Sequence, residues 1–167
     1  FLSKDHIRRL LHIPPETERK LNELRRLNQP VVFFIPHVAL FELLAASPHF
    51  RPGGNRRFGA VYRPNSNPAI DSWILQARRQ KGLPMFARNE ALVEAKGHLR
   101  KNNWLGVLFD QNAGKSGTLS TFLGRIASLT PLPGLLAFGT KSRTFFALTE
   151  RSGFFRATLV LKEMKGE

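Results

Sequence analysis

A chain of 167 residues, 42% hydrophobic and 23% charged, is long enough for one globular domain with its own core, and its composition excludes a disordered chain. Without cysteine it has no disulfide framework, no thiol nucleophile and no cysteine-based metal site, which suits a reducing compartment. A formal charge of +14 favours an anionic partner: nucleic acid, anionic lipid or an acidic protein.

The positive charge is concentrated in the middle of the chain. Residues 51–101 carry eleven Lys and Arg against three acids, which is +8 of the total of +14. No run of five like charges occurs, so we expect a folded basic surface rather than a basic tail. No signal peptide and no stretch of eighteen apolar residues is present. Because the chain begins at Phe1, we expect it to be a piece of a longer protein, which leaves a membrane anchor outside this chain open.

Two helices are expected in the N-terminal segment 1–29. The first, over 4–12, has an apolar side and is broken by two prolines. The second, over 16–28, is more polar and would dock through a narrow leucine stripe. That stripe consists of Leu21, Leu24 and Leu27.

Residues 31–35 are apolar and lie between two prolines, a pattern typical of a strand buried on both faces. His37 would follow the carboxyl end of this strand, where open α/β sheets build their sites. Residues 38–46 favour an apolar helix, so Glu42 needs a partner, and His37 is the nearest in sequence. By themselves the two residues fit a catalytic pair, or a rim histidine and a bridging glutamate. A metal site is disfavoured because no His-Glu-x-x-His pattern supplies further ligands.

Further strands are predicted over 56–63, 84–87 and 104–109, and helices alternate with them. Such an alternation predicts a parallel sheet. The helix after the strand at 56–63 starts at Asn67 as its cap, and another covers 90–102, with Asn89 as its cap. The first of these has a regular apolar face that we expect to be buried, with its tryptophan in the core. That face consists of Ile70, Trp73, Ile74 and Ala77.

Asp110 and Gln111 follow the strand at 104–109 and mark the same sheet edge as His37. The glycine-rich stretch 112–118 is not a Walker P-loop, and a lid, an anion-binding nest and an ordinary turn all remain open for it. A short helix is expected over 132–139. The last two strands, 144–150 and 154–162, surround a turn and predict an antiparallel pair.

The sequence therefore predicts an α/β fold: a mostly parallel central sheet flanked by helices, with an antiparallel strand pair near the C-terminus. We expect one domain over 1–167, in which the helical segment 1–29 precedes an α/β core over 30–165.

The order of these pieces resembles the bacterial lipid A biosynthesis acyltransferases, of the lauroyl/myristoyl type, in the lysophospholipid acyltransferase superfamily. The resemblance extends over roughly residues 31–160 and depends on several short motifs in order rather than on any one of them. The motifs are His37-x4-Glu42, Val61-Tyr62-Arg63-Pro64, Asn67-Pro68 with Asp71, Arg88, Leu108-Phe109-Asp110-Gln111, Gly117, Phe122-Leu123-Gly124 and Thr130-Pro131.

One motif departs from the family. Its members usually have His-Phe-Gly-Asn-Trp-Glu after a glycine, whereas this chain has Pro36 and then His37-Val38-Ala39-Leu40-Phe41-Glu42. The histidine and the glutamate are kept, and the Gly-Asn-Trp between them is lost.

The resemblance implies a glycerolipid acyltransferase-like fold and the transfer of an acyl chain to a hydroxyl of a lipid A precursor or a related lipid. His37 would be the general base and Glu42 the residue that orients its ring. The donor would be an acyl carrier protein thioester or acyl-CoA, with no metal and no other cofactor. The resemblance also assigns substrate binding to Tyr62, Arg63, Arg88, Asp110 and Gln111.

The implied partners are acyl carrier protein, an anionic lipid or glycolipid acceptor and a membrane surface, at the cytoplasmic face of the bacterial inner membrane. Two alternatives compete with this prediction. One is a catalytically inactive, membrane-associated lipid-binding relative, against which the presence of both His37 and Glu42 argues. The other is a basic nucleic-acid-binding domain, for which no recognition motif is visible.

Overall fold

The computed structural model describes residues 4–79, 82–88 and 91–164. Its helices are α1 Lys4–Leu10, α2 Pro15–Leu27, α3 Glu42–Ala46, α4 Pro68–Arg79, α5 Ala91–Leu99 and α6 Leu132–Thr140, with 3-10 turns η1 Pro48–Phe50 and η2 Gly114–Ser116. Its strands are β1 Leu11–His12, β2 Val31–Ile35, β3 Phe58–Tyr62, β4 Met85–Ala87, β5 Trp104–Leu108, β6 Thr118–Phe122, β7 Arg125–Leu129, β8 Arg143–Gly153 and β9 Arg156–Met164.

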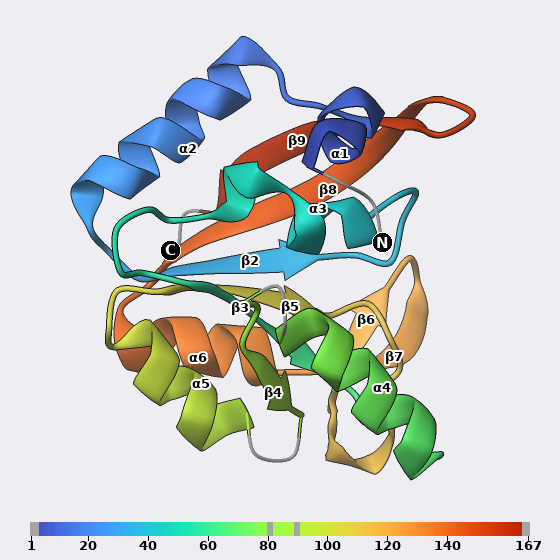
Figure 1. Ribbon diagram of the computed structural model, residues 1–167. Helices are drawn as coiled ribbons and strands as arrows, with labels where there is room; N and C mark the ends of the chain where they lie inside the picture. Colours follow the sequence, from blue (N-terminus) through green and yellow to red (C-terminus); the bar gives the residue numbers. More distant parts are fainter. Residues whose placement is uncertain (1–3, 80–81, 89–90, 165–167) are drawn as a thin grey trace.

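The predicted α/β fold is confirmed. Seven strands form one sheet in the order β1-β9-β8-β2-β5-β3-β4 (Figure 1). The strands from β8 to β4 in this order are parallel, whereas β8 and β9 pair antiparallel, as expected for the last two strands. A second, two-stranded sheet consists of β6 and β7, which the sequence did not predict.

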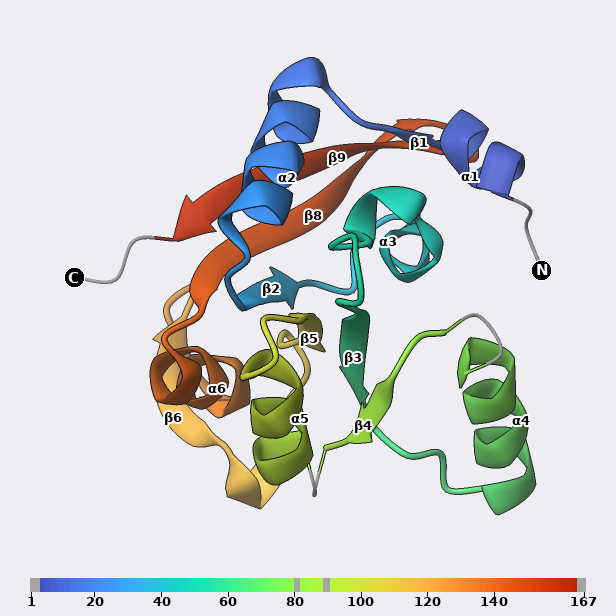
Figure 2. The ribbon, with the colours of Figure 1, turned by 60° about the vertical axis from the view of Figure 1, so that its left-hand side comes forward.

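Both faces of β2 are buried, because its residues alternate between two cores. Val31, Phe33 and Ile35 pack on the side covered by α2 and α3, whereas Val32 packs on the side covered by α5 and α6. Figure 2 shows these helix groups on opposite sides of the sheet. Phe50, whose place the sequence left open, is fully buried and packs edge-on against the ring of Phe33, with centroids 5.0 Å apart.

The N-terminal segment differs in part from the expected pair of helices. The predicted helix over 4–12 ends at Leu10, and Leu11–His12 instead add a strand, β1, that pairs with β9. In α2, Leu21 and Leu24 are buried, but Leu27 is exposed at the end of the predicted stripe.

The predicted buried face of α4 is wrong. Trp73 is 65% exposed and Ile70 is also exposed, whereas Ile74 is only partly covered. Helix α4 lies at the β4 edge of the sheet (Figure 2), where only part of its apolar stripe finds a surface to pack on. Helix α4 ends at Arg79, and Gly82 has a left-handed φ of +69°, which glycine adopts without strain. The predicted cap Asn89 lies outside the described residues.

The described helices include none that is long and apolar enough to cross a membrane.

Candidate active site

His37 and Asp110 meet at the carboxyl edge of the sheet because they follow neighbouring strands at matched positions. Strands β2 and β5 are parallel, and their register pairs Ile35 with Leu108. Two residues further along come His37 and Asp110. The imidazole Nδ1 lies 2.6 Å from Asp110 Oδ1, and the backbone N–H of His37 donates to Oδ2 at 2.8 Å. One carboxylate therefore holds both the ring and the backbone of His37.

The environment of Asp110 favours its ionised form. Burial raises the pKa of its carboxyl, but the hydrogen bonds from the side chain and the backbone of His37 outweigh this effect and bring the pKa below its usual range. An ionised carboxylate accepts the Nδ1–H, which leaves the lone pair on Nε2. The amide nitrogen of Gln111 lies 3.3 Å from this Nε2, and the Phe41 ring packs edge-on against the imidazole. The ring is held in one orientation.

The predicted contact between Glu42 and His37 is corrected by the structure, which gives each a different partner. The exposed carboxylate of Glu42 accepts hydrogen bonds from the Arg78 guanidinium at 3.2 and 3.4 Å. The reason is local: residues 38–41 form turns instead of the expected helix, and Ala39 takes a left-handed φ of +46°. This residue redirects the chain before α3 begins, so Asp110 takes the place beside the imidazole.

The loop after β3 is held by Asp71. The Tyr62 hydroxyl donates to one oxygen of this carboxylate at 3.5 Å, and the backbone N–H of Asn65 donates to the other at 2.8 Å. The side-chain oxygen of Asn67 accepts a backbone N–H of the first turn of α4 at 3.0 Å, which confirms the predicted cap. These bonds fix the loop that carries Arg63.

A cleft of about 250 Å³ opens beside His37, and three arginines line it. Arg63 is exposed and, within the described part of the chain, has no ion-pair partner. Arg78 is paired with the glutamate of α3, and Arg88 donates to the Ala113 carbonyl at 3.5 Å. The cleft therefore offers guanidinium groups to an anion next to a histidine whose Nε2 contacts only the exposed Gln111 amide among the described residues.

The structure brings most of the predicted site residues together at this cleft. Asp110 lies behind the ring of His37, whereas Glu42 lines a neighbouring pocket. The cleft itself is lined by the predicted residues His37, Tyr62, Arg63, Arg88 and Gln111.

The neighbouring pocket, of about 60 Å³, is largely apolar and shares walls with the cleft. Val61, Tyr62 and Leu108 belong to both. Deeper in, the pocket is lined by Leu44 and Met85 among others. The site thus combines a cationic opening with an apolar recess.

Arg78 is a site residue that the sequence analysis missed. In the sequence, Arg78 lies in the last turn of a predicted helix, where a positive charge favours the helix dipole, so it has an explanation without a role in a site. A signal was present: Asp71, Ile74 and Arg78 recur at i, i+3 and i+7, one face of a helix, and all three line the cleft. The apolar stripe of α4 predicted that the helix packs on the core, and this prediction left no cleft for Arg78 to line.

Within the described residues no group of three His, Asp or Glu side chains gathers that could hold a metal ion. Residues 1–151 match the family described as bacterial lipid A biosynthesis acyltransferase, whereas a comparison with curated proteins gave no match. The matched span runs from α1 into β8 and includes His37, Asp110 and the three arginines of the cleft. Since it covers most of the chain, this protein belongs to the bacterial lipid A biosynthesis acyltransferase family.

Proposed function

We propose that the protein transfers a fatty acyl chain from an acyl carrier protein thioester, or from acyl-CoA, to a hydroxyl of a lipid A precursor or a related anionic lipid. The observation that carries this proposal is a histidine fixed by a carboxylate at the mouth of an arginine-lined cleft. The family assignment supports an acyltransferase, and the arrangement of the side chains supports the finer steps that follow.

His37 acts as the general base. With its Nδ1–H donated to Asp110, Nε2 accepts the proton of the acceptor hydroxyl as that oxygen attacks the thioester carbonyl. The tetrahedral intermediate then expels the thiolate, and the imidazolium returns the proton to it. Asp110 stabilises the imidazolium and keeps the ring in one tautomer, the role that the family resemblance implies for Glu42. Gln111, which contacts Nε2 at 3.3 Å, gives way to the acceptor hydroxyl.

The arginines bind the anionic part of the acceptor. Arg63 and Arg88 flank the cleft, and a guanidinium matches the oxygens of a phosphate with two parallel hydrogen bonds. Glu42 acts through Arg78, because their ion pair holds this third guanidinium at the wall shared by the cleft and the apolar pocket.

The apolar recess receives the start of the acyl chain. Most of its apolar residues belong to the larger of the two apolar cores, directly beside the cleft. Gly106 forms part of its wall, and a Cβ there would approach Phe58 and Ile35 to 2.9 and 3.0 Å, so a larger residue at this position would displace the side chains that line the recess. An acidic carrier protein would approach through the basic surface, at the cytoplasmic face of the inner membrane.

Acyl transfer from a labelled acyl carrier protein thioester to a pool of lipid A precursors and lysophospholipids tests this proposal. His37→Ala is expected to lower the rate of product formation by about 10³-fold. His12→Ala is the matched control, because it removes an exposed imidazole on β1 without touching the cleft. Folded wild-type protein that acylates no lipid, or a His37→Ala variant that remains active, would contradict it. Lipid binding without turnover would favour the inactive-relative alternative.

A further inference from the structure

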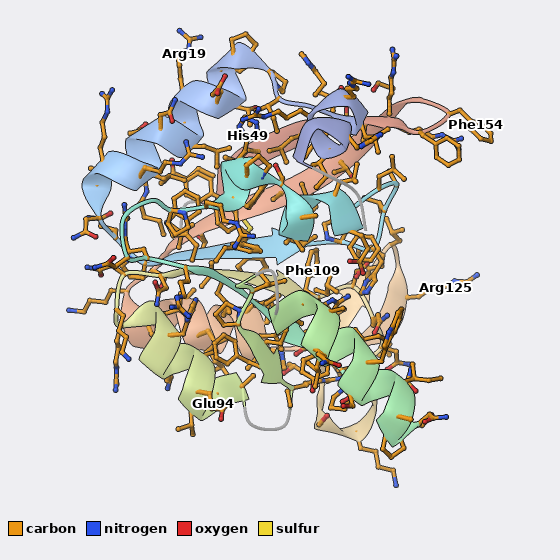
Figure 3. All side chains as sticks on the ribbon, in the orientation of Figure 1. Arg19, His49, Glu94, Phe109, Arg125 and Phe154 are labelled. Atoms are coloured by element: carbon orange, nitrogen blue, oxygen red, sulfur yellow. The ribbon has the colours of Figure 1, made fainter. Side chains whose placement is uncertain are left out.

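The β6–β7 hairpin stands apart from the main sheet. Its strands pair only with each other, and every residue of β6 is exposed. Figure 1 shows the hairpin at the end of the molecule toward which β2 points, and Figure 3 places Arg125 on its outer side. Four large apolar side chains of this segment are nevertheless exposed, at Leu119, Phe122, Leu123 and Ile126.

The apolar side chains do not share one face. Leu119 pairs with Ser128 and Thr121 with Ile126, so Leu119 and Ile126 lie diagonally on one face of the ribbon. Phe122, next in the chain after Thr121, points to the other face opposite Arg125. A flat protein partner, or a second copy of this chain, would cover only one face. An apolar medium that surrounds the ribbon covers both.

The tip of the hairpin carries a leucine where the backbone disfavours one. Leu123 and Gly124 form the turn with φ of +49° and +76°, which is the two-residue turn that prefers Asn, Asp or Gly at its first position. Leucine gains nothing from the turn, and its side chain is 88% exposed. A strained backbone conformation at an exposed leucine indicates that the Leu123 side chain has a role in function.

The base of the hairpin is firmly joined to the candidate active site. The Ser128 hydroxyl donates to the Gly114 carbonyl at 2.7 Å, and the Ala113 N–H donates to the Ser128 carbonyl at 3.0 Å. A Cβ on Gly117 would collide with the Ser128 side chain, so this contact is closely packed. Ala113 also accepts the hydrogen bond from Arg88 of the cleft, which links the hairpin to the site.

The surrounding charge is positive. Residues 114–129, which form the hairpin and its base, contain two cations, Lys115 and Arg125, and no acid. We propose that the β6–β7 hairpin docks the protein on an anionic lipid surface, with Leu119, Phe122, Leu123 and Ile126 entering the boundary of the acyl region. Amphipathic helices on membrane surfaces enter this boundary to a depth of roughly 5–10 Å. The docking deepens the proposed function and rests on it for its purpose, because it holds the cleft at the surface that contains a lipid acceptor.

Co-sedimentation with lipid vesicles tests the docking without an acyl donor. We would compare the wild type with the combined variant Leu119→Thr, Leu123→Asn, Ile126→Thr on vesicles of phosphatidylcholine and phosphatidylglycerol in equal parts. Threonine suits a strand and asparagine suits the left-handed turn, so the variant keeps the hairpin. Val93→Thr on α5 is the matched control, because Val93 is 79% exposed and lies outside the hairpin.

The combined variant is expected to bind the anionic vesicles at least about tenfold more weakly than the wild type, while Val93→Thr binds as the wild type does. Equal binding by wild type and combined variant, or no vesicle binding by the wild type, would overturn the proposal. So would a wild-type dimer in sedimentation velocity, without lipid, that the combined variant cannot form. Acyl transfer to a detergent-dispersed acceptor, measured in parallel, should be retained in the combined variant. Failure of docking is thereby distinguished from failure of the proposed function.

Discussion

Two histidines, at opposite ends of the parallel strands, show what the fold does with the same side chain. His98 on α5 lies beside the amino end of β5, where Nε2 donates to the Trp104 carbonyl at 3.0 Å and Nδ1 lies 3.3 Å from the Asn103 amide nitrogen. It is 9% exposed, and burial lowers its pKa. His37, beyond the carboxyl end of β2, keeps 27% of its side chain exposed and has a carboxylate as partner.

The two histidines differ in whether a ring nitrogen is accessible to a ligand. Both ring nitrogens of His98 are engaged by buried groups of the same fold, so it is a structural residue. His37 is bonded firmly at Nδ1, whereas its Nε2 faces a cleft and contacts the exposed amide of Gln111 at 3.3 Å. A buried, fully satisfied histidine stabilises a fold, and a half-satisfied one at a cleft can move a proton.

The largest effect expected is on activity when the ring at the cleft is removed. His37→Ala should lower kcat for acyl transfer by about 10³-fold, because general base catalysis is lost. Its thermal midpoint should stay close to that of the wild type, since the ring is partly exposed. Thermal unfolding followed by circular dichroism checks the fold. Retained activity in the folded variant would contradict a catalytic role for His37.

Asp110→Asn should lower kcat by about 10²-fold, because the amide no longer favours the Nδ1–H tautomer. Nitrogen NMR of the labelled His37 ring should show the proton on Nδ1 in the wild type and a changed tautomer ratio in the variant. An unchanged ratio would break the proposed link between Asp110 and the ring.

The lowered pKa of Asp110 also gives a stability prediction. Its folded-state pKa lies below the unfolded value of about 4, so the ionised contact contributes fully above that pH and is lost as the pH falls through the folded pKa. Denaturant unfolding at pH 6 and at pH 3 should show this loss in the wild type and a smaller one in Asp110→Asn. Equal losses in both proteins would contradict the contact.

His98→Gln should affect stability and leave activity per folded molecule unchanged. We expect a loss of about 1–3 kcal/mol at pH 7, because buried partners lose well-placed hydrogen bonds. Burial depresses the folded pKa of His98, so the unfolded chain binds more protons below about pH 6.5 and wild-type stability falls there. The free energy of unfolding should therefore fall less between pH 7 and pH 5 in the variant than in the wild type. An equal fall in both proteins would contradict a buried neutral ring.

The smallest effect is expected at Ala39. Its left-handed φ of +46° strains an alanine, and glycine, which the family usually has here, removes that strain. Because glycine also adds freedom to the unfolded chain, the net gain should be only about 0.5 kcal/mol. Chemical denaturation of Ala39→Gly measures it, and a destabilised variant would contradict the strain.

Most of the fold could be predicted from local patterns. The continuous apolar runs of β2 and β5 indicate strands buried on both faces, and the alternation with helices indicates a parallel sheet. The hairpin β6–β7 could not be predicted in this way, because its apolar side chains lie on both faces of the ribbon and do not form the one-sided pattern of a strand that packs on a core. The exposed Trp73 was misjudged because periodicity shows that a helix has an apolar face, and not what that face packs on.

The sequence predicted most residues of the candidate site, but it did not predict which of them contact each other. Polar residues after two buried strands indicated one sheet edge for His37 and Asp110. Only the strand order shows that β2 and β5 are neighbours, and their register sets the two residues side by side. Proximity in sequence favoured Glu42 instead, and the left-handed Ala39, which no helix pattern reveals, removed it.

The most direct test of the account is to measure kcat of Asp110→Asn and Glu42→Gln side by side, with saturating acceptor and the same acyl carrier protein thioester. If Asp110 holds the ring and Glu42 only holds Arg78, the Asp110 variant should be at least about tenfold slower than the Glu42 variant. A Glu42→Gln variant that is equally slow or slower, in folded protein, would contradict the account and make Glu42 the residue on which the base depends.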